Sequence, residues 1–378
     1  MEGEVMLRPE FLFKELQKNG VGFFSGVPDS LLKNFCAYVT DNTGKKEHII
    51  AANEGCAVGL AAGYHIATGG IPLVYMQNSG MGNMTNPLLS LADEDVYNIP
   101  LILMIGWRGE PGVHDEPQHV KQGKVTCTLL EAMGIPYSVL PSEEDECIPI
   151  LNECFEHLKN KGSPYALVVR KNTFDKYSLS KKEETWYDMT REEAIEAIVE
   201  SIGDRDVIVS TTGMASRELY EIRDRRGEGH DRDFLTVGSM GHSSQIALGI
   251  AMNRDEGRVI CIDGDGAMLM HMGGMSTITT IGPKNLTHIV INNGVHDSVG
   301  GQPTVSREID VLSIAKAMGY DTVASVDDVP ALKDAIGHAE GTAFIEVMVR
   351  KGNRDDLGRP KTTPVENKES LMKFIRGM

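Results

Sequence analysis

Positive charge and paired cysteines are scarce in this sequence. Its 378 residues include 37 Lys and Arg against 54 Asp and Glu, which gives a formal net charge of −17. This balance argues against nucleic acid or an anionic membrane surface as a partner. None of the six cysteines forms a C-x-x-C pair, and most fall in apolar segments. We therefore expect reduced core thiols in a cytoplasmic protein rather than a disulfide framework.

Long hydrophobic runs and a basic leader are also missing. No run approaches the roughly 18 apolar residues of a membrane-spanning helix. Residues 1–5 carry acidic side chains where a secretory signal would carry basic ones. We therefore expect a cytoplasmic protein without a membrane partner, long enough for two domains of ordinary size.

Strands and helices alternate along the whole chain. In the first half, apolar runs predict strands at Val21–Phe24, His48–Ala52, Pro72–Met76, Pro100–Ile105 and Tyr165–Val169, with helices at Phe11–Lys18, Glu54–Ile66 and Glu143–Leu158. In the second half, a helix near Arg191–Ile202 precedes strands at Asp206–Ser210, Phe234–Val237, Arg258–Ile262, His288–Asn292 and Phe344–Val349. This alternation predicts two doubly wound parallel-sheet α/β domains of similar size.

A polar, charge-rich stretch without a sustained apolar period separates the two halves. We interpret it as a linker. The expected boundaries are a first domain at 1–172, a linker at 173–189 and a second domain at 190–378, with no middle domain between the halves.

The clearest chemical signal is a GDG motif whose acidic residue, Asp265, follows the predicted strand Arg258–Ile262. Asn292 and Asn293 end the next predicted strand, and helical spacing over Ala267–Ile281 predicts a helix between them. Ligands of open parallel sheets bind at this carboxyl edge. Asp and Asn oxygens suit a Mg²⁺ ion that also holds a diphosphate. An ordinary turn with glycine chosen for its backbone is the alternative for a lone GDG, and the doubled Asn counts against it.

The GDG…NN spacing resembles the signature of thiamine diphosphate enzymes. A second carboxylate, Glu54, lies in the first turn of a predicted helix rich in small residues. Negative charge is common there because the helix dipole favours it. The resemblance implies more: Glu54 lies beside the pyrimidine N1′ of thiamine diphosphate and helps to activate the cofactor. The small neighbouring residues let the ring approach the backbone closely.

The order of the halves extends this resemblance over nearly the whole chain. A pyrimidine-binding (PYR) half precedes a diphosphate-binding (PP) half, as in the phosphonopyruvate and sulfopyruvate decarboxylase branch of the family. The stretches Ser25–Ser30, His114–His119, Gly238–His242 and Asp356–Pro360 also resemble this branch. The resemblance implies thiamine diphosphate and Mg²⁺ as cofactors. It also implies a homo-oligomer in which each active site combines two subunits.

The resemblance assigns cofactor contacts to the second half. The implied metal ligands are Asp265, Asn293 and the backbone carbonyl of Val295. Met240 is the implied bulky residue under the cofactor, although core filling is the usual role of Met. His242 opens a helix, where phosphate oxygens are favoured. Further expected cofactor contacts are Thr212, Gly213, Met214, Gly238, Gly264 and Gly266.

Proton transfer has three candidates. Asp29 either caps the helix after it or, as the resemblance implies, lies near the reactive carbon of the cofactor. His114 and His119 form either a solvated loop or a proton source near neutral pH. We assign catalysis to His114, which is nearer the strand end, and place Ser25 and His119 at the substrate. Metal binding by the two histidines lacks a third ligand.

Recognition of an anionic keto acid requires local positive charge. Between Arg350 and Lys361, five basic residues outnumber two acidic ones. We expect Arg354, Arg359 or Lys361 to bind a phosphonate, with Arg108 as another candidate, because Arg makes paired hydrogen bonds to such groups. A solvated tail is the alternative.

The expected activity is decarboxylation of 3-phosphonopyruvate to phosphonoacetaldehyde and CO₂ in phosphonate (2-aminoethylphosphonate) biosynthesis. Sulfopyruvate decarboxylation is the main alternative, and we expect the fusion of two halves to count against it. An acetolactate-synthase-like ligase is disfavoured because a middle domain is missing. A non-catalytic nucleotide-binding α/β protein would show no dependence on thiamine diphosphate. The glycine-rich segment Gly294–Thr304 either moves over the substrate or forms a rigid turn.

Overall fold

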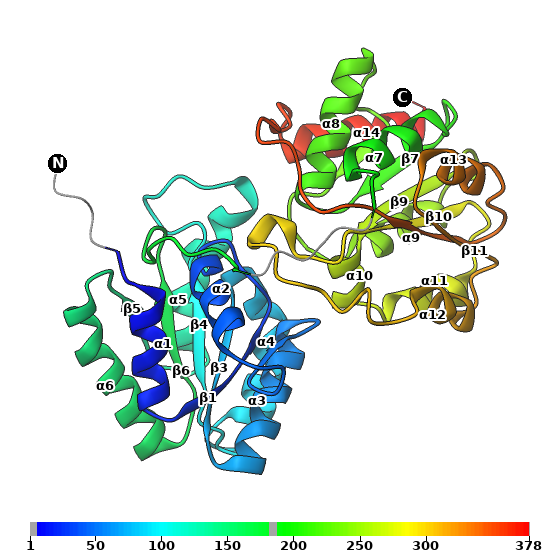
Figure 1. Ribbon diagram of the computed structural model, residues 1–378. Helices are drawn as coiled ribbons and strands as arrows, with labels where there is room; N and C mark the ends of the chain where they lie inside the picture. Colours follow the sequence, from blue (N-terminus) through cyan, green and yellow to red (C-terminus); the bar gives the residue numbers. More distant parts are fainter. Residues whose placement is uncertain (1–5, 181–186, 378) are drawn as a thin grey trace. The chain divides into compact units, whose positions relative to one another are not determined.

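The computed structural model describes residues 6–180 and 187–377. The chain divides into two compact units, the first comprising Met1–Lys182 with Val299–Gln302, and the second Glu183–Ser298 with Pro303–Met378. Each unit contains one six-stranded sheet (Figure 1). The predicted α/β class is confirmed. The acidic residues 1–5 and part of the predicted linker, 181–186, lie outside the described residues.

The first sheet is parallel throughout and has the order β2-β1-β3-β4-β6-β5. Its strands are β1 Val21–Gly26, β2 His48–Ile50, β3 Ile71–Gln77, β4 Ile102–Gly106, β5 Tyr137–Leu140 and β6 Tyr165–Val169. The order reverses between β1 and β3, and a ligand crevice is expected at the carboxyl ends of such strands. Strand β5 was not predicted, because it is four residues long and lies at the sheet edge.

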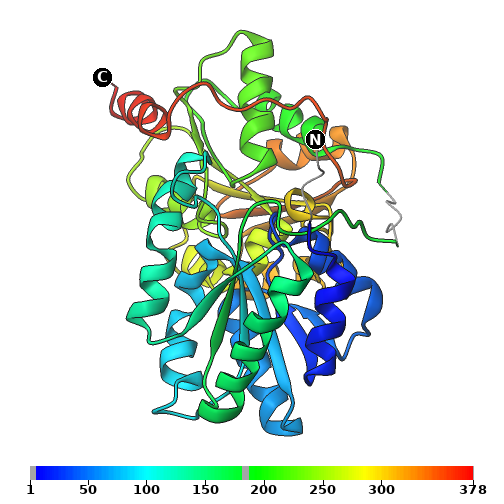
Figure 2. The same ribbon diagram turned by 90° about the vertical axis from the view of Figure 1, so that its left-hand side faces the viewer.

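Helices cover both faces of the first sheet (Figures 1 and 2). One face packs against α1 Pro9–Lys18, α2 Lys33–Asn42 and α6 Glu144–Lys161. The other packs against α3 Glu54–Thr68, α4 Met81–Pro87, α5 Pro117–Ala132 and the short turns η1 Asn78–Gly80 and η2 Leu88–Ala92. The buried central strands therefore read as continuous apolar runs, which is typical of a parallel sheet covered on both sides.

The second sheet is also parallel and has the order β11-β12-β10-β9-β7-β8. Its strands are β7 Val207–Ser210, β8 Asp233–Leu235, β9 Val259–Gly264, β10 Leu286–Asn292, β11 Thr322–Val326 and β12 Ala343–Met348. Strand β11 was not predicted, because it is a partly exposed edge strand without strong apolar character. The order reverses between β7 and β9, next to the GDG motif.

Two layers of helices cover the second sheet as well. The first layer is α7 Arg191–Glu200, α8 Met214–Arg226 and α13 Val329–Gly337. The second is α9 Ser243–Ala251, α10 Asp265–Met270, α11 Gly274–Ile281, α12 Val311–Met318 and α14 Pro364–Arg376, and a short turn η3 spans Asp297–Val299. The single helix expected over Ala267–Ile281 is wrong. The chain leaves helical geometry at His271 (φ −135°, ψ 43°) and resumes after Gly273.

The predicted linker begins and ends in packed structure. Phe174 is buried in the first core and forms a parallel bridge with Leu7, whereas Met189 is buried in the second core. The boundaries 173–189 stay a prediction. No helix in the described part of the chain is both long and apolar enough to cross a membrane.

All six cysteines are free, and four of them, Cys36, Cys147, Cys154 and Cys261, are buried as expected. Cys127 is partly buried. Cys56 is exposed on α3, so the prediction of a core thiol is wrong at that position.

Candidate active site

Glu54 is a buried carboxylate at the start of α3. Asn53 caps this helix by accepting a hydrogen bond from the Cys56 backbone N–H at 2.9 Å. The Glu54 side chain is 4 % exposed, and its Oε2 accepts a 2.7 Å hydrogen bond from Asn83 Nδ2. Gly80 lies against the same carboxylate, where there is no room for a side chain. One well-held carboxylate is what a pyrimidine nitrogen would need here.

Asp29 follows β1 and is fully buried. Its Oδ2 accepts from Gln77 Nε2 at 2.7 Å, and its Oδ1 accepts from the Leu31 backbone N–H at 2.9 Å. Helix α2 starts only at Lys33 and has no side-chain cap, so Asp29 is not its cap. Burial raises the pKa of Asp29, which favours the protonated carboxyl.

Arg108 and Asp115 form a partly buried ion pair after β4. Arg108 donates from Nε to Asp115 Oδ2 at 2.7 Å and from Nη2 to Oδ1 at 2.5 Å. Arg108 Nη1 donates to Ser30 Oγ at 2.9 Å. Burial alone would raise the pKa of Asp115. The hydrogen bonds from Arg108 outweigh burial and lower this pKa. The pair therefore stays charged and fixes the guanidinium plane.

A cavity of about 320 Å³ opens beside this ion pair. Its lining includes Ser30, Lys33, Arg108, His114 and Lys171. His114 is exposed, so it reaches both solvent and this cavity. The structure thus brings His114 and Arg108 into one pocket in the same unit as Asp29.

The interpretation of His119 as an exposed loop residue is wrong. His119 lies in the first turn of α5 and is 8 % exposed, with no partner for Nδ1 among the described residues. Burial, followed by the positive charge of Arg108, lowers the pKa of His119 to about 4. Ser25, also predicted at the substrate, is buried within β1, and its hydroxyl lacks a partner within the described ranges. Both roles stay predictions.

Asp265 is the first residue of α10, directly after β9. It is 3 % exposed, and its Oδ2 accepts hydrogen bonds from Thr304 Oγ1 at 2.5 Å and Ser306 Oγ at 2.7 Å. Burial raises the pKa of Asp265, and the hydroxyl hydrogen bonds oppose this. Ser306 Oγ also lies 2.9 Å from Asn292 Oδ1, so the GDG and NN motifs meet at one edge.

Asn293 is oriented by a carboxylate that the sequence did not single out. Its Nδ2 donates to Asp297 Oδ2 at 2.9 Å, and that oxygen also accepts from the Gly352 backbone N–H at 2.8 Å. Arg191 Nη1 lies 3.3 Å from the same oxygen. Because Nδ2 donates to Asp297, the amide oxygen Oδ1 faces the other way, where it accepts a 3.1 Å hydrogen bond from the Val295 backbone N–H and keeps a second lone pair. Oδ1 is the atom expected to bind metal.

The two asparagines of the motif have different surroundings. Asn292 is buried, donates from Nδ2 to Glu346 Oε1 at 2.8 Å, and accepts from the Gly294 backbone N–H. Both polar groups of Asn292 are therefore used within the protein. Val295, whose carbonyl is the third predicted ligand, forms an antiparallel bridge with Pro303. This bridge closes the segment Gly294–Thr304 into a hydrogen-bonded loop.

The remaining predicted cofactor contacts lie in the second unit at helix N-termini beside the GDG motif. Gly213 precedes α8 with φ 94°, a conformation that favours glycine, between Thr212 and Met214. His242 precedes α9 and is exposed, with its ring 4.5 Å from that of His271. Met240 is partly buried, and its Cε lies near Gly266. Gly238 lies in a bend ahead of α9, and Gly264 is the last residue of β9. These contacts stay predictions.

The basic tail is paired with acidic helices. Arg354 forms ion pairs with Glu192, Glu221 and Asp356, and Lys361 Nζ lies 3.3 Å from Asp224. The segment holds five basic and two acidic residues. Arg354 and Lys361 of the tail are therefore already engaged by helix carboxylates. The roles of Arg354, Arg359 and Lys361 stay predictions.

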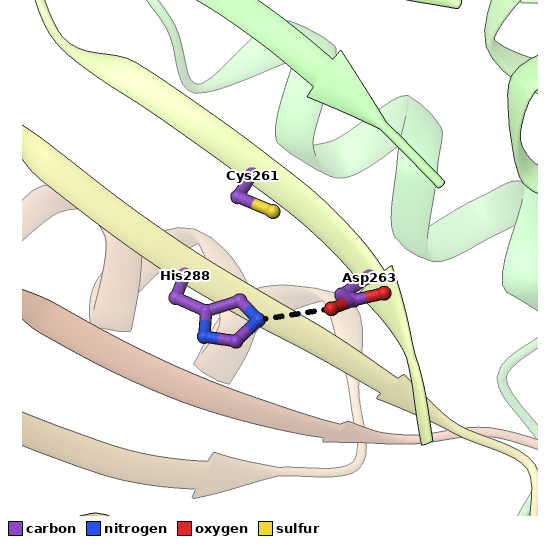
Figure 3. A group of neighbouring side chains, drawn as sticks. All are labelled: Cys261, Asp263 and His288. Carbon is purple, nitrogen blue, oxygen red and sulfur yellow. Dashed lines mark hydrogen bonds and ion pairs between the residues drawn. The ribbon is translucent and has the colours of Figure 1, made fainter. Parts of the chain in front are cut away.

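A second polar cluster lies beneath the GDG motif, where Cys261 and Asp263 on β9 face His288 on β10 (Figure 3). His288 Nε2 lies 3.3 Å from Asp263 Oδ2, and His288 Nδ1 lies 3.1 Å from the Tyr320 hydroxyl. Burial raises the pKa of the Cys261 thiol well above its usual value, which favours the neutral thiol. We interpret the cluster as a hydrogen-bonded support that joins β9 to β10 ahead of Asp265.

Sequence reasoning missed the residues that hold the predicted ones in place. Asn83 and Gly80 contact Glu54, Gln77 donates to Asp29, and Asp297, Thr304 and Ser306 contact the predicted metal ligands. The only sequence signal for the last three was their position in or next to the glycine-rich segment after the NN motif.

Comparison with known proteins identifies the family of this chain. The family model described as "Thiamine pyrophosphate enzyme, N-terminal TPP binding domain" matches residues 9–128, and its C-terminal counterpart matches residues 211–347. A phosphonopyruvate decarboxylase of Streptomyces viridochromogenes is 34 % identical over 94 % of this chain and 92 % of its own length. A sulfopyruvate decarboxylase of Methanosarcina acetivorans is 28 % identical over 98 % of this chain and 97 % of its own length.

The chain therefore belongs to the family of thiamine pyrophosphate enzymes, and thiamine diphosphate is its cofactor. Within that family it is a decarboxylase, a carbon–carbon lyase, of the branch that contains phosphonopyruvate and sulfopyruvate decarboxylases. The Methanosarcina protein aligns with both halves in one chain, so the expected argument from fusion of the halves does not separate the two substrates.

Proposed function

We propose that this protein decarboxylates 3-phosphonopyruvate to phosphonoacetaldehyde and CO₂, with Mg²⁺ and thiamine diphosphate, in phosphonate biosynthesis. The observation that carries this proposal is the similarity to a phosphonopyruvate decarboxylase over 94 % of the chain. The loss of CO₂ is strongly favourable. It would therefore pull forward the preceding step of the pathway, the unfavourable formation of a carbon–phosphorus bond.

Asp265, Asn293 and the Val295 carbonyl would hold Mg²⁺, and the ion would anchor the diphosphate. All three donors are oxygens, which suits Mg²⁺. Two of them follow neighbouring strands, β9 and β10, and both side chains are oriented by hydrogen bonds within the same unit. Glu54 would accept a hydrogen bond from the pyrimidine nitrogen.

When bound, thiamine diphosphate supplies the electron sink that accepts the electrons released as CO₂ departs. Asp29 and His114 would then transfer the proton that takes the place of CO₂ on the substrate carbon. The raised pKa of Asp29 favours a carboxyl that holds a proton, and Gln77 fixes its position. His114 lies where a proton from solvent can enter the cavity.

Charge favours Arg108 over the tail as the binder of the phosphonate. The cavity beside Arg108 is lined by three cations, Lys33, Arg108 and Lys171, and by two carboxylates, Glu110 and Asp115. Glu110 is itself paired with Arg170 at 2.8 Å. The cavity therefore carries a positive balance, whereas Arg354 of the tail is already paired with three carboxylates and Lys361 with one. A phosphonate would accept hydrogen bonds from Arg108 and Ser30.

We also propose a cytoplasmic homo-oligomer in which Glu54 and Asp265 of different subunits complete one site. The excess of acidic residues and the six free cysteines support the compartment. Sedimentation of the purified protein, with and without cofactors, tests the assembly, and a monomer with full activity would refute it.

The decisive experiment measures CO₂ release from phosphonopyruvate with and without added thiamine diphosphate and Mg²⁺. The proposal requires release that depends on both cofactors. Active protein that releases CO₂ from sulfopyruvate alone would overturn the substrate assignment and leave the cofactor assignment intact.

Sulfopyruvate decarboxylation is the second candidate function. It is favoured by the end-to-end similarity to the Methanosarcina enzyme. A sulfopyruvate decarboxylase subunit beta of Methanocaldococcus jannaschii is also 41 % identical over 36 % of this chain and 69 % of its own length. Comparing kcat/KM for the two acids decides between them.

A further inference from the structure

We propose that Thr304 and Ser306 determine which divalent metal this site accepts, by restricting Asp265 to a single coordinating oxygen. This inference rests on the metal site of the proposed function and adds the residues that set its selectivity. Both hydroxyls donate to the same carboxylate atom, Oδ2, at 2.5 and 2.7 Å. Within residues 6–180 and 187–377, no side-chain hydroxyl donates a hydrogen bond to Oδ1 of Asp265.

The hydroxyls cannot easily turn away from Asp265. Thr304 and Ser306 are 9 % and 1 % exposed, so neither can reach bulk water in exchange. The Thr304 backbone N–H donates to the Gly294 carbonyl at 2.9 Å, and the Val295–Pro303 bridge lies beside it. The Ser306 side chain is enclosed from the other side by Asn292, whose Oδ1 lies 2.9 Å from Ser306 Oγ. The two donors are therefore fixed in the same loop that carries the Val295 carbonyl.

The arrangement is consistent in its protons. An ionised carboxylate accepts and does not donate, and each hydroxyl has one proton. The single Ser306 proton has three neighbours: Asp265 Oδ2 at 2.7 Å, Asn292 Oδ1 at 2.9 Å and Thr304 Oγ1 at 2.7 Å. Thr304 and Ser306 both donate to Oδ2 when Ser306 directs its proton there, and the contact with Asn292 Oδ1 is then not a hydrogen bond. Thr304 Oγ1 also accepts from the Ser306 backbone N–H at 3.4 Å. Oδ2 is then engaged twice, and its lone pairs are unavailable to a metal.

One-oxygen coordination discriminates between metals. Mg²⁺ requires near-octahedral geometry at roughly 2.0–2.1 Å, whereas Ca²⁺ takes about 6–8 oxygens at longer distances and often binds a carboxylate through both. With Oδ2 hydrogen-bonded to both hydroxyls, which we call the clamp, Asp265 can coordinate a metal only through Oδ1. This single-oxygen coordination fits the compact geometry of Mg²⁺, whereas Ca²⁺ would lose the second carboxylate oxygen. Removing the hydroxyls frees Oδ2 for bidentate binding.

The test is titration calorimetry of thiamine diphosphate into metal-free protein at a series of fixed Mg²⁺ or Ca²⁺ concentrations. Because the ion would anchor the diphosphate, the dependence on each ion gives its affinity, and the method reads binding rather than activity. In Ser306→Ala, Thr304→Val and the double variant, we expect Mg²⁺ affinity to fall about tenfold while Ca²⁺ affinity holds or rises, as for other outer-shell partners of metal ligands. The ratio of the two dissociation constants then shifts toward Ca²⁺ by at least that factor.

Two variants serve as controls. Thr304→Ser keeps a hydroxyl and should keep the wild-type ratio. Ser325→Ala removes a hydroxyl that donates to Glu346 Oε2 at 3.2 Å, in the same unit but not on Asp265, and should also keep it. Circular dichroism of each variant checks the fold, and the single variants give the answer if the double variant does not fold.

The outcomes separate the clamp from the metal site. Wild-type protein that binds neither ion with thiamine diphosphate refutes the site itself. Wild-type protein that binds Mg²⁺, together with folded variants whose Mg²⁺-to-Ca²⁺ ratio is unchanged, refutes the clamp alone. An equal loss of affinity for both ions would show that the hydroxyls only support the loop.

Discussion

Gly80 faces Glu54 so closely that a Cβ at position 80 would lie 2.2 Å from Oε1 of the carboxylate. The backbone at Gly80 has φ −72°, which any residue adopts. Glycine is therefore required here by space and not by backbone conformation.

Gly80→Ala tests the position of Glu54. The added methyl must push the carboxylate aside, away from its hydrogen bond with Asn83. A displacement of about 1 Å is enough to lower kcat/KM roughly 100-fold. Steady-state CO₂ release measures it.

Gly82→Ala is the matched control, because a Cβ there meets nothing within 4 Å and Gly82 lies two residues further on, in the first turn of α4. It should retain wild-type kcat/KM. Unchanged kinetics in Gly80→Ala would mean that Glu54 has no role in activation.

Asp297→Ala tests the orientation of Asn293. Without this acceptor, the Asn293 amide loses the contact that turns Oδ1 toward the metal. We expect Mg²⁺ affinity in the presence of thiamine diphosphate to fall by about 10- to 100-fold. Calorimetric titration of the metal gives the constant.

Asp310→Ala removes a different loop carboxylate, one that caps α12 through the Ser313 backbone N–H. Its Mg²⁺ affinity should match wild type. If both variants bind Mg²⁺ as wild type does, Asn293 needs no orienting partner.

His119 predicts a pH-dependent loss of stability. Its pKa is lowered from 6.5 to about 4 in the folded protein, so the unfolded chain takes up a proton first as pH falls. The contribution of neutral His119 to the stability of the folded protein is therefore complete above pH 6.5 and is lost as pH falls toward 4. When His119 is protonated in the unfolded chain and neutral in the folded protein, the full pKa difference lowers the free energy of unfolding by about 3 kcal/mol.

Unfolding of wild type and His119→Gln by urea, followed between pH 7 and 5, measures this loss. The variant should show a shallower decline. His114→Gln, which removes an exposed histidine nearby, should decline as wild type does. Equal slopes in all three proteins would place the His119 pKa at its ordinary value.

Arg108→Gln tests the substrate pocket. Removing a fixed guanidinium should cost about 1.5–3 kcal/mol of substrate binding, which is roughly a 10- to 100-fold rise in KM for phosphonopyruvate. Arg354→Gln, whose side chain is engaged by three carboxylates, should change KM little. The reverse pattern would assign the phosphonate to the tail.

Asp263→Ala tests the cluster beneath the GDG motif. It leaves the buried His288 with only the Tyr320 hydroxyl and should lower the free energy of unfolding by about 3 kcal/mol. Chemical denaturation measures the change.

Cys261→Ala, which leaves the Asp263–His288 contact in place, should cost only about 1 kcal/mol. Metal analysis of the purified protein accompanies both. Stoichiometric zinc that disappears in both variants would make the cluster a metal site instead of a support.

The sequence predicted the parts of the fold that have strong periodicity. Central strands such as β4 and β10 are buried on both faces and were recognised as apolar runs. The edge strands β5 and β11 were missed because one side of each lacks a neighbour, and short, partly exposed strands need few apolar residues. The break at His271 was missed because apolar spacing continues through it.

The candidate site divides in the same way. Glu54, Asp265 and Asn293 were identifiable because each follows or ends a predictable element. Thr304, Ser306 and Asp297 lie in an irregular loop, and only the three-dimensional path of the chain brings them to the ligands. The exposure of His119 was misjudged because the start of α5 was not recognised, so a helical residue was taken for a loop residue.

Each sheet is enclosed on both faces by helices from its own half of the chain. A polypeptide cut between the halves would therefore leave both interiors whole, and two shorter genes could encode the same pair of folds. The subunits alpha and beta of the Methanococcus maripaludis sulfopyruvate decarboxylase are two separate proteins that match this chain over 42 % and 50 % of its length.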